Sequence, residues 1–322
     1  MDEAFRFALL GLGAGSLYAI AAIGLVLVYR GSGVVNFAQG AIGMVGAYAY
    51  WEAHIEHGLS QPVSFAIGLV VSAAIGAVFY LVIIRNMREA SNLAKIVATL
   101  ALLLVLDSIA FLRYDPLPIL VPSWLPNHPT DILGAVVGAD RVWIFVIVIV
   151  LTTVLWMIYK FTKFGVATTA VAENPRAVAA LAISPDFIAT VNWAAGAALG
   201  GFAAMLLVPI TALGSGILTF MVIPVLAAAV VGRFSSFPLT TLAGLGIGIA
   251  QSEITLYGDR WSQSLGISTS GWGTAVPFVL VAIILLVRGK KVAGKDERFG
   301  RMPKLGTGKI AWGLLALGVV VA

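Results

Sequence analysis

Charged residues are scarce in this chain of 322 residues: only 11% are Asp, Glu, Lys or Arg, against roughly 25% in soluble domains. Cysteine is absent, which excludes disulfides, thiolate catalysis and cysteine-bound metals. Only three histidines occur, and no arrangement of Ser, His and carboxylate stands out. The sequence therefore predicts no catalytic residues, no metal site and no cofactor. The net charge of +5 does not indicate nucleic acid, because the basic residues lie in short loops and in one tail.

Apolar residues make up 60% of the chain, and the mean hydropathy is +1.00. An α-helix needs about 20 apolar residues to cross the hydrocarbon core of a bilayer. We expect an all-α, polytopic membrane helix bundle with about eight or nine membrane segments, some of them re-entrant. The nine predicted segments are Phe7–Val28, Val34–Trp51, Val63–Ile84, Leu93–Leu112, Val142–Tyr159, Phe187–Val208, Thr219–Val231, Pro238–Leu256 and Thr274–Val287.

The seventh predicted segment, Thr219–Val231, has only 13 residues and contains Pro224. We expect it to be broken or re-entrant, which is tolerated only where protein or a water-filled cavity covers the backbone.

Lys and Arg favour the cytoplasmic side of a membrane. If the N-terminus is outside and all nine segments cross, 16 of the 20 Lys and Arg residues face the cytoplasm. This distribution predicts an external N-terminus and a cytoplasmic tail.

The predicted domain order has three parts. A transmembrane domain, residues 1–288, contains a cytoplasmic hairpin at 160–186, and a basic cytoplasmic linker follows at 289–309. The apolar run 310–322 is too short to span a bilayer. We interpret it as the start of a further membrane segment, so that the chain is a piece of a longer polypeptide.

The hairpin at 160–186 is rich in alanine and reads as two short helices broken at Asn174-Pro175. Pro175 suits the first turn of the second helix, with Asn174 as its N-cap. A helical hairpin that does not span the membrane has the shape of a docking element.

The densest motif is Asn36-Phe37-Ala38-Gln39-Gly40. Asn36 and Gln39 are i,i+3 neighbours if both lie on a helix, so that their amides face one direction. This pattern fits either helix packing or the polar lining of a transport path. Asp107 and Glu253 are carboxylates inside predicted spans, and such residues are candidates for the path, although both lie toward the outer ends.

The glycine-rich stretch at 289–296 nearly matches a phosphate-binding loop, but Asp296 stands where Ser or Thr should bind magnesium. The sequence therefore predicts no ATPase site in this chain.

Three blocks resemble the permease subunits of branched-chain amino acid ABC transporters, in particular the first of their two permease types. The first block is the N-terminal GLGAGSLYAIAAIGLVLVYRGSGVVNFAQGAIGMVGAY, the second is VVGRFSSFPLTTLAGLGIGIAQSE, and the third is the hairpin. The resemblance covers about Phe7–Lys291. This chain has Gln39 where the family often has His, and Ala182, Arg233, Ser235 and Leu239 replace customary glycines.

The resemblance implies a multi-pass permease in the bacterial cytoplasmic membrane that imports branched-chain amino acids or related amides. It implies four kinds of partner: two cytoplasmic P-loop ATPase subunits, a second permease subunit or domain, an extracytoplasmic substrate-binding protein, and lipid. The hairpin would contact the ATPase through Glu173, Asn174, Pro175, Arg176, Ala179 and Ile183, and the path would include Asn36, Gln39, Gly40, Asp107 and Glu253. The apolar run from Ile310 would begin the second permease type of a fusion.

Two alternatives remain open at this point. An ion-coupled secondary transporter of a small polar solute would need intramembrane charges, of which only Asp107 and Glu253 are candidates. A membrane scaffold without transport activity would need no Asn36/Gln39 pair.

Overall fold

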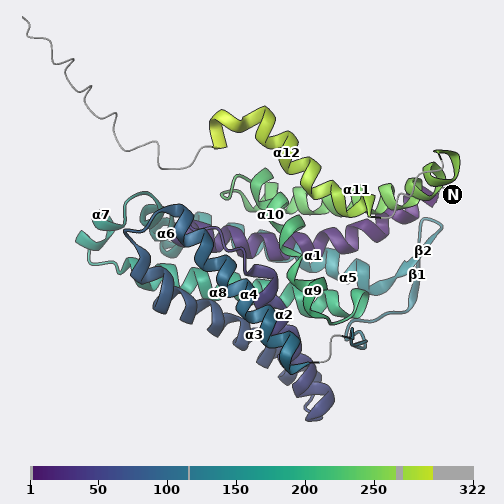
Figure 1. The fold of residues 1–322 in the computed structure, drawn as a ribbon, viewed down its shortest axis with the longest axis horizontal. Helices are drawn as coiled ribbons and strands as arrows, with labels where there is room; N and C mark the ends of the chain where they lie inside the picture. The colour runs from purple at the N-terminus through teal and green to yellow at the C-terminus, as the bar shows by residue number, and fades with distance from the viewer. Residues whose placement is uncertain (1–2, 115–116, 266–270, 293–322) are drawn as a thin grey trace, which may run out of the picture. The chain divides into compact units, whose positions relative to one another are not determined.

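The computed structural model describes residues 3–114, 117–265 and 271–292. The described chain divides after Ala282 into two units, and residues 283–292 are described separately. Most of the predicted linker at 289–309 and the whole apolar run 310–322 lie outside the described residues. The α-helices, shown in Figure 1, are α1 (Glu3–Ser32), α2 (Gln39–Trp51), α3 (Gln61–Phe79), α4 (Asn92–Arg113), α5 (Ala139–Phe161), α6 (Lys163–Glu173), α7 (Pro175–Ala180), α8 (Pro185–Thr211), α9 (Ser215–Thr219), α10 (Val222–Val231), α11 (Phe237–Leu265) and α12 (Trp272–Val292).

Five helical stretches in the described part are long and apolar enough to cross a membrane. They are Glu3–Ser32, Gln61–Met87, Asn92–Arg113, Ala139–Phe161 and Pro185–Thr211. The helical membrane bundle expected from the sequence is therefore confirmed. The predicted segment Thr219–Val231 is broken, because α9 ends at Thr219 and α10 begins at Val222.

The second predicted segment was expected to be helical from Val34. Instead, residues 34–38 are not helical, and α2 begins only at Gln39. This irregular backbone is covered by protein: Val34, Asn36 and Ala38 are buried. Such cover is the condition under which non-helical backbone is tolerated at membrane depth.

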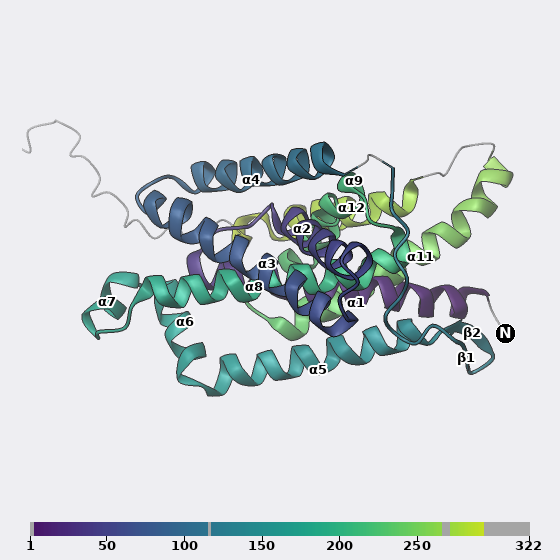
Figure 2. The same cartoon turned by 90° about the horizontal axis from the view of Figure 1, so that it is seen from below.

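Helix α1 lies at the centre of the first unit and packs against α8 and α11, with α5 and α10 beside it. Figure 2 shows α4 and α5 on opposite sides of α1 and α8. Residues 19–28 of α1 are buried without exception. A helix that is apolar all round is a buried helix, so its composition accounts for its place.

Glycines allow these helices to approach closely. A Cβ built on Gly24 of α1 would lie 2.5 Å from the carbonyl oxygen of Gly196 of α8, and the reverse contact measures the same. A Cβ on Gly15 would lie 2.7 Å from the carbonyl oxygen of Gly244 of α11. The small-residue pairs therefore serve helix packing, as is common in membrane bundles.

The proline-rich loop between α4 and α5 carries the two strands of the described part. Strand β1 (Pro129–Ile132) pairs antiparallel with β2 (Ala135–Gly138), and Thr130 lies opposite Val137. The loop also joins the residues after α8, through a β-bridge between Ile119 and Leu213. The loop is therefore tied to itself by the β1–β2 pair and to the end of α8 by the bridge.

Candidate transport path and cytoplasmic hairpin

Asn36 and Gln39 form a buried pair of amides, with exposed fractions of 0% and 1%. Asn36 Nδ2 donates to Gln39 Oε1 at 3.2 Å, and Gln39 Nε2 donates to the carbonyl oxygen of Gly196 at 2.8 Å. Asn36 Oδ1 accepts from the backbone N–H of Ala38. The two amides do meet, but the expectation that both lie on a helix is wrong for Asn36. Its side chain hydrogen-bonds the backbone of the turn before α2, a local bond that competes with helix.

Gly40, one residue further along α2, contacts the broken segment. A Cβ on Gly40 would lie 2.6 Å from the carbonyl oxygens of Leu218 and Thr219. The hydroxyl of Thr219 donates to Asp107 Oδ1 of α4 at 2.7 Å. The structure thus brings together Gly40 and Asp107, two of the predicted path residues, at the end of α9. There the helical segment breaks between α9 and α10.

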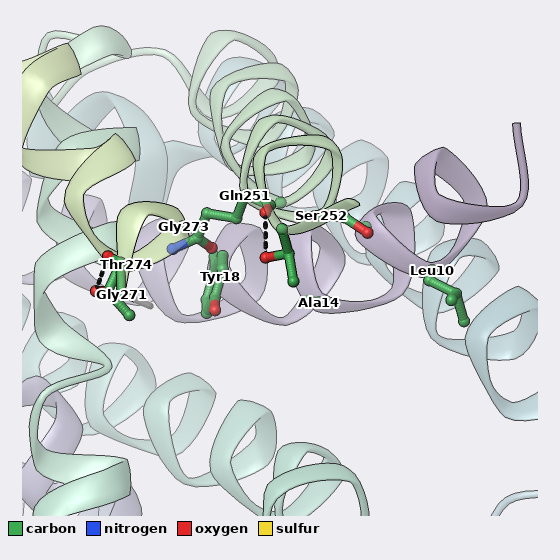
Figure 3. A pocket seen from close by; sticks show the side chains of 11 residues that line it. Leu10, Ala14, Tyr18, Gln251, Ser252, Gly271, Gly273 and Thr274 are labelled. Carbon is green, nitrogen blue, oxygen red and sulfur yellow. Dashed lines mark hydrogen bonds between the residues drawn. The ribbon is translucent and has the colours of Figure 1, made fainter. Parts of the chain in front are cut away.

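Glu253 is separate from this group. It lies partly buried on α11, and its carboxylate makes no hydrogen bond or ion pair within the described ranges. Its neighbours Gln251 and Ser252 line a cavity of about 350 Å³ between α1, α11 and the first turn of α12 (Figure 3). The cavity's serine and threonine hydroxyls donate to backbone carbonyls, as Ser252 does to Phe7 at 2.6 Å.

The hairpin follows its predicted form. Helix α6 ends at Glu173, and α7 begins at Pro175. Asn174 Oδ1 accepts the backbone N–H of Ala177 at 3.1 Å, so the predicted N-cap is confirmed. Ala179 is exposed, Ile183 is 39% exposed, and Arg176 lies in the first turn of α7.

The hairpin has one buried and one exposed apolar face. Val171 and Val178 pack with Ile188 of α8. At the surface, Leu181 is 73% exposed and Ile183 is 39% exposed. An apolar surface that the chain leaves open in this way indicates an interaction site.

Side-chain hydrogen bonds fix the hairpin to the bundle. Asn192 of α8 is fully buried and joins two elements: its Oδ1 accepts from the Tyr159 hydroxyl at 2.6 Å, and its Nδ2 donates to Thr168 Oγ1 at 3.3 Å. Arg30, at the end of α1, donates to Thr169 Oγ1 at 3.2 Å. Its guanidinium also lies over the Tyr159 ring, 5.1 Å from the centroid. These contacts connect α6 to both α1 and α8.

Sequence reasoning missed Asn192, Thr219 and Arg30. Asn192 left a signal, because it is a lone amide inside the apolar run Phe187–Val208, and a polar side chain at that depth needs a partner. Thr219 and Arg30 gave no such signal in the sequence, since threonine is common at the end of a membrane segment and arginine is common at the membrane interface.

Comparison with known proteins gives one matching family. The family described as "Branched-chain amino acid transport system / permease component" matches residues 7–287. The branched-chain amino acid permease protein BraD of Pseudomonas aeruginosa is 28% identical over 301 residues, which are 89% of this chain and 94% of BraD. LivH of Escherichia coli K12 is 26% identical over 301 residues, which are 89% of this chain and 94% of LivH.

A probable branched-chain amino acid permease LivH of Methanocaldococcus jannaschii is 28% identical over 287 residues, which are 87% of this chain and 90% of that protein. Among solved structures, PsaBC from Streptococcus pneumoniae in complex with Fab aligns with a TM-score of 0.45 at 13% identity. That alignment covers 89% of this chain and 92% of the PsaBC chain.

Proposed function

Since this chain belongs to the permease-component family of branched-chain amino acid transport systems and is the permease subunit of an ABC importer, we propose that it imports a branched-chain amino acid or a related small amide. The family implies ATPase and substrate-binding partners. The observation that carries the site assignment is the hairpin, whose one apolar face packs on α8 while the other lies open. A permease needs an exposed surface of this kind to contact the ATPase whose conformational change drives transport.

The proposed complex contains two cytoplasmic P-loop ATPase subunits, a second permease subunit or domain, and an extracytoplasmic binding protein. ATP would be hydrolysed in the partner subunits, and the N-terminus would face outward with residues 289–309 in the cytoplasm. Specificity would lie mainly in the binding protein, because an apolar pocket discriminates by only about 1–3 kcal/mol per methylene.

The proposed contact with the ATPase comprises Glu173, Asn174, Pro175, Arg176, Ala179 and Ile183. Closure of the ATPases on ATP would push α6 and α7. The hydrogen bonds of Asn192 and Arg30 support this role, because they connect the hairpin to α8 and α1. The bundle would then open toward the opposite side of the membrane, as in rigid-body alternating access.

The proposed path runs along α2, α4 and α9. Asp107 would meet the ammonium group of the amino acid, since an intramembrane carboxylate at the break between two short helices suits a cation. Gly40 would keep α9 close to α2, and Asn36 and Gln39 would hold the start of α2 in place. Glu253 would belong to the outer part of the path, at the α1–α11 side.

The family match over residues 7–287 argues against the ion-coupled secondary transporter that the sequence left open. Uptake should accordingly be lost when ATP is depleted and kept when the ion gradient is dissipated with an ionophore.

Cysteine crosslinking tests the proposal directly, because the chain has no cysteine of its own. We expect Ala179→Cys, on the exposed side of α7, to crosslink a P-loop ATPase in native membranes, in a manner that responds to ATP. Val178→Cys is the matched control, since the neighbouring Val178 is only 3% exposed. Equal capture by both variants, or capture by neither with intact protein, would contradict docking on this face.

A further inference from the structure

The carboxylate of Asp186 lies where the hairpin joins α8, and it binds three groups at the end of α3. Asp186 Oδ2 pairs with Arg85 Nε at 3.1 Å, Asp186 Oδ1 pairs with Arg88, and the Tyr80 hydroxyl donates to Oδ1 at 3.2 Å. Asp186 also stands in the first turn of α8, where a negative charge interacts favourably with the helix dipole. We name Asp186, Arg85, Arg88 and Tyr80 the α3–α8 clamp.

The irregular end of α3 builds this clamp. After Phe79 the helix continues as a π-helical turn, Tyr80–Ile84, in which the backbone N–H of Arg85 donates to the carbonyl of Tyr80. A short 3₁₀ turn, Arg85–Met87, follows, and side chains three residues apart eclipse in that geometry. Arg85 and Arg88 are therefore brought to one side. A π-helical turn is rare and occurs frequently at functional sites.

Apolar packing continues behind the clamp. Trp193, one of the fully buried side chains of α8, lies against Phe79 and Tyr80 with ring centroids 5.6 and 6.2 Å away. Its indole nitrogen donates to Ser32 Oγ at the end of α1. The start of α8 therefore packs on the end of α3 through these rings as well as through the Asp186 pairs.

We propose that Asp186 is a positioning residue that transmits movement of the hairpin to α3, a role that rests on the function proposed above. The contacts continue from α3 toward the broken segment. Gly46 of α2 meets the carbonyl of Gly68 of α3, with a built Cβ 2.9 Å from that oxygen, and Gly40 of α2 packs on α9. Displacement of α3 therefore reaches the residues around Asp107 through backbone contacts.

The exposure of the clamp separates this role from stability. The side chains of Arg85 and Arg88 are 52% and 58% exposed, and that of Asp186 is 23% exposed. Ion pairs between exposed side chains contribute little to the stability of a fold. A variant that loses the pairs should therefore still fold, and any loss of transport would come from the missing connection.

The experiment compares Asp186→Asn, Asp186→Glu and Glu89→Gln in the importer purified with its partners and reconstituted into liposomes. Glu89 is the matched control: it is an exposed carboxylate beside Arg88 that forms no ion pair within the described ranges. Uptake of radiolabelled leucine and ATP hydrolysis are measured together, and each variant also carries Ala179→Cys to report ATPase contact.

We expect Asp186→Asn to keep ATP hydrolysis and the crosslink, while leucine moved per ATP falls by about fivefold or more, the low end of coupling between two sites. Asp186→Glu should retain most of the coupling, and Glu89→Gln should match the parent. An unchanged ratio in Asp186→Asn overturns the proposal. If that variant does not reach the membrane, the double variant Arg85→Gln/Arg88→Gln takes its place with the same expectation.

Failure of the proposed function gives a different result. If the parent with Ala179→Cys captures no ATPase, the docking assignment fails, and the role of Asp186 fails with it. If the parent captures the ATPase and Asp186→Asn stays fully coupled, only the role of Asp186 is removed.

Discussion

Adding a methyl group to Gly244 should destabilise the protein, whereas adding one to Gly246, two residues further along α11, should not. Gly244 is buried against α1: a Cβ there would lie 2.8 Å from the backbone N and Cα of Ala19. Gly246 is exposed, and a Cβ there would meet nothing within 4 Å. Gly246→Ala is thus a matched control for Gly244→Ala on the same helix.

The size of the effect follows from this contact. Carbon atoms in favourable contact are about 3.5–4.0 Å apart, so Gly244→Ala requires α1 and α11 to separate by roughly 1 Å. The new methyl group meets backbone, which cannot change rotamer. Overpacking of this kind costs about 1–3 kcal/mol. The gain in helix propensity, about 1 kcal/mol in water, is common to both variants and cancels. Gly244→Ala should therefore be about 1–3 kcal/mol less stable than Gly246→Ala.

The assay is reversible unfolding of the purified protein in mixed detergent micelles, followed by helical circular dichroism as the denaturing detergent is increased. The free energy of unfolding of each variant is compared with that of the parent. Equal stability of the two variants would refute the reasoning, because it would mean that α1 and α11 do not approach as closely at Gly244 as the built Cβ distances require.

Three further outcomes are expected. Ala182→Gly should stabilise the end of α7 by about 1 kcal/mol, because Ala182 has a φ of +58°; slower amide exchange in α7 would show it. Thr219→Val should lower leucine uptake and reduce stability by about 1–3 kcal/mol, because it leaves Asp107 without its hydroxyl partner, and Thr219→Ser should restore both. Hydrogen bonding by Arg113, and secondarily by Tyr114, lowers the pKa of Glu52 from 4.5. The stabilisation of the fold by ionised Glu52 is therefore present above about pH 4.5 and is lost as the pH falls through the lowered pKa of the folded protein. Glu52→Gln should lose less unfolding free energy than the parent over this pH range in acid unfolding.

Local signals made the hairpin predictable from the sequence. Asn174 and Pro175 determine a helix start by bonds within four residues, and the structure has that cap. The break in the seventh segment was equally local, because its length and Pro224 exclude a full span. Such features depend on residues that are neighbours in the sequence, and they can therefore be predicted without knowledge of the tertiary structure.

Contacts between distant residues were not predictable in the same way. The start of α2 was placed too early, because burial of Asn36 by other elements favours the turn over the helix that the apolar run indicated. The α3–α8 clamp joins Tyr80 and Arg85 to Asp186, more than a hundred residues away. It also requires a π-helical turn, for which the sequence carries no rule.

The replaced glycines show what a resemblance can and cannot predict. Ala182 and Arg233 stand where the resembling family has glycine, and both have a positive φ, of +58° and +56°. Ser235 and Leu239 replace glycine too, but neither has a positive φ, and Leu239 lies within α11. At positions 182 and 233 the backbone itself therefore favours glycine, since a left-handed conformation costs a residue with a side chain about 1–2 kcal/mol.

The strained backbone at Arg233 is followed by a second strained residue, Phe234, whose ring makes a stabilising contact. Phe234 also has a positive φ, of +51°, and its ring lies 4.6 Å from that of Tyr29 at the end of α1. Aromatic pairs contribute about 0.5–1.5 kcal/mol beyond their area, which offsets part of the strain of the turn before α11. Ala182 has no such contact among the described residues. At Ala182 the strained residue instead closes the end of α7, where the backbone N–H groups of Ala182 and Ile183 donate to the carbonyls of Ala179 and Val178.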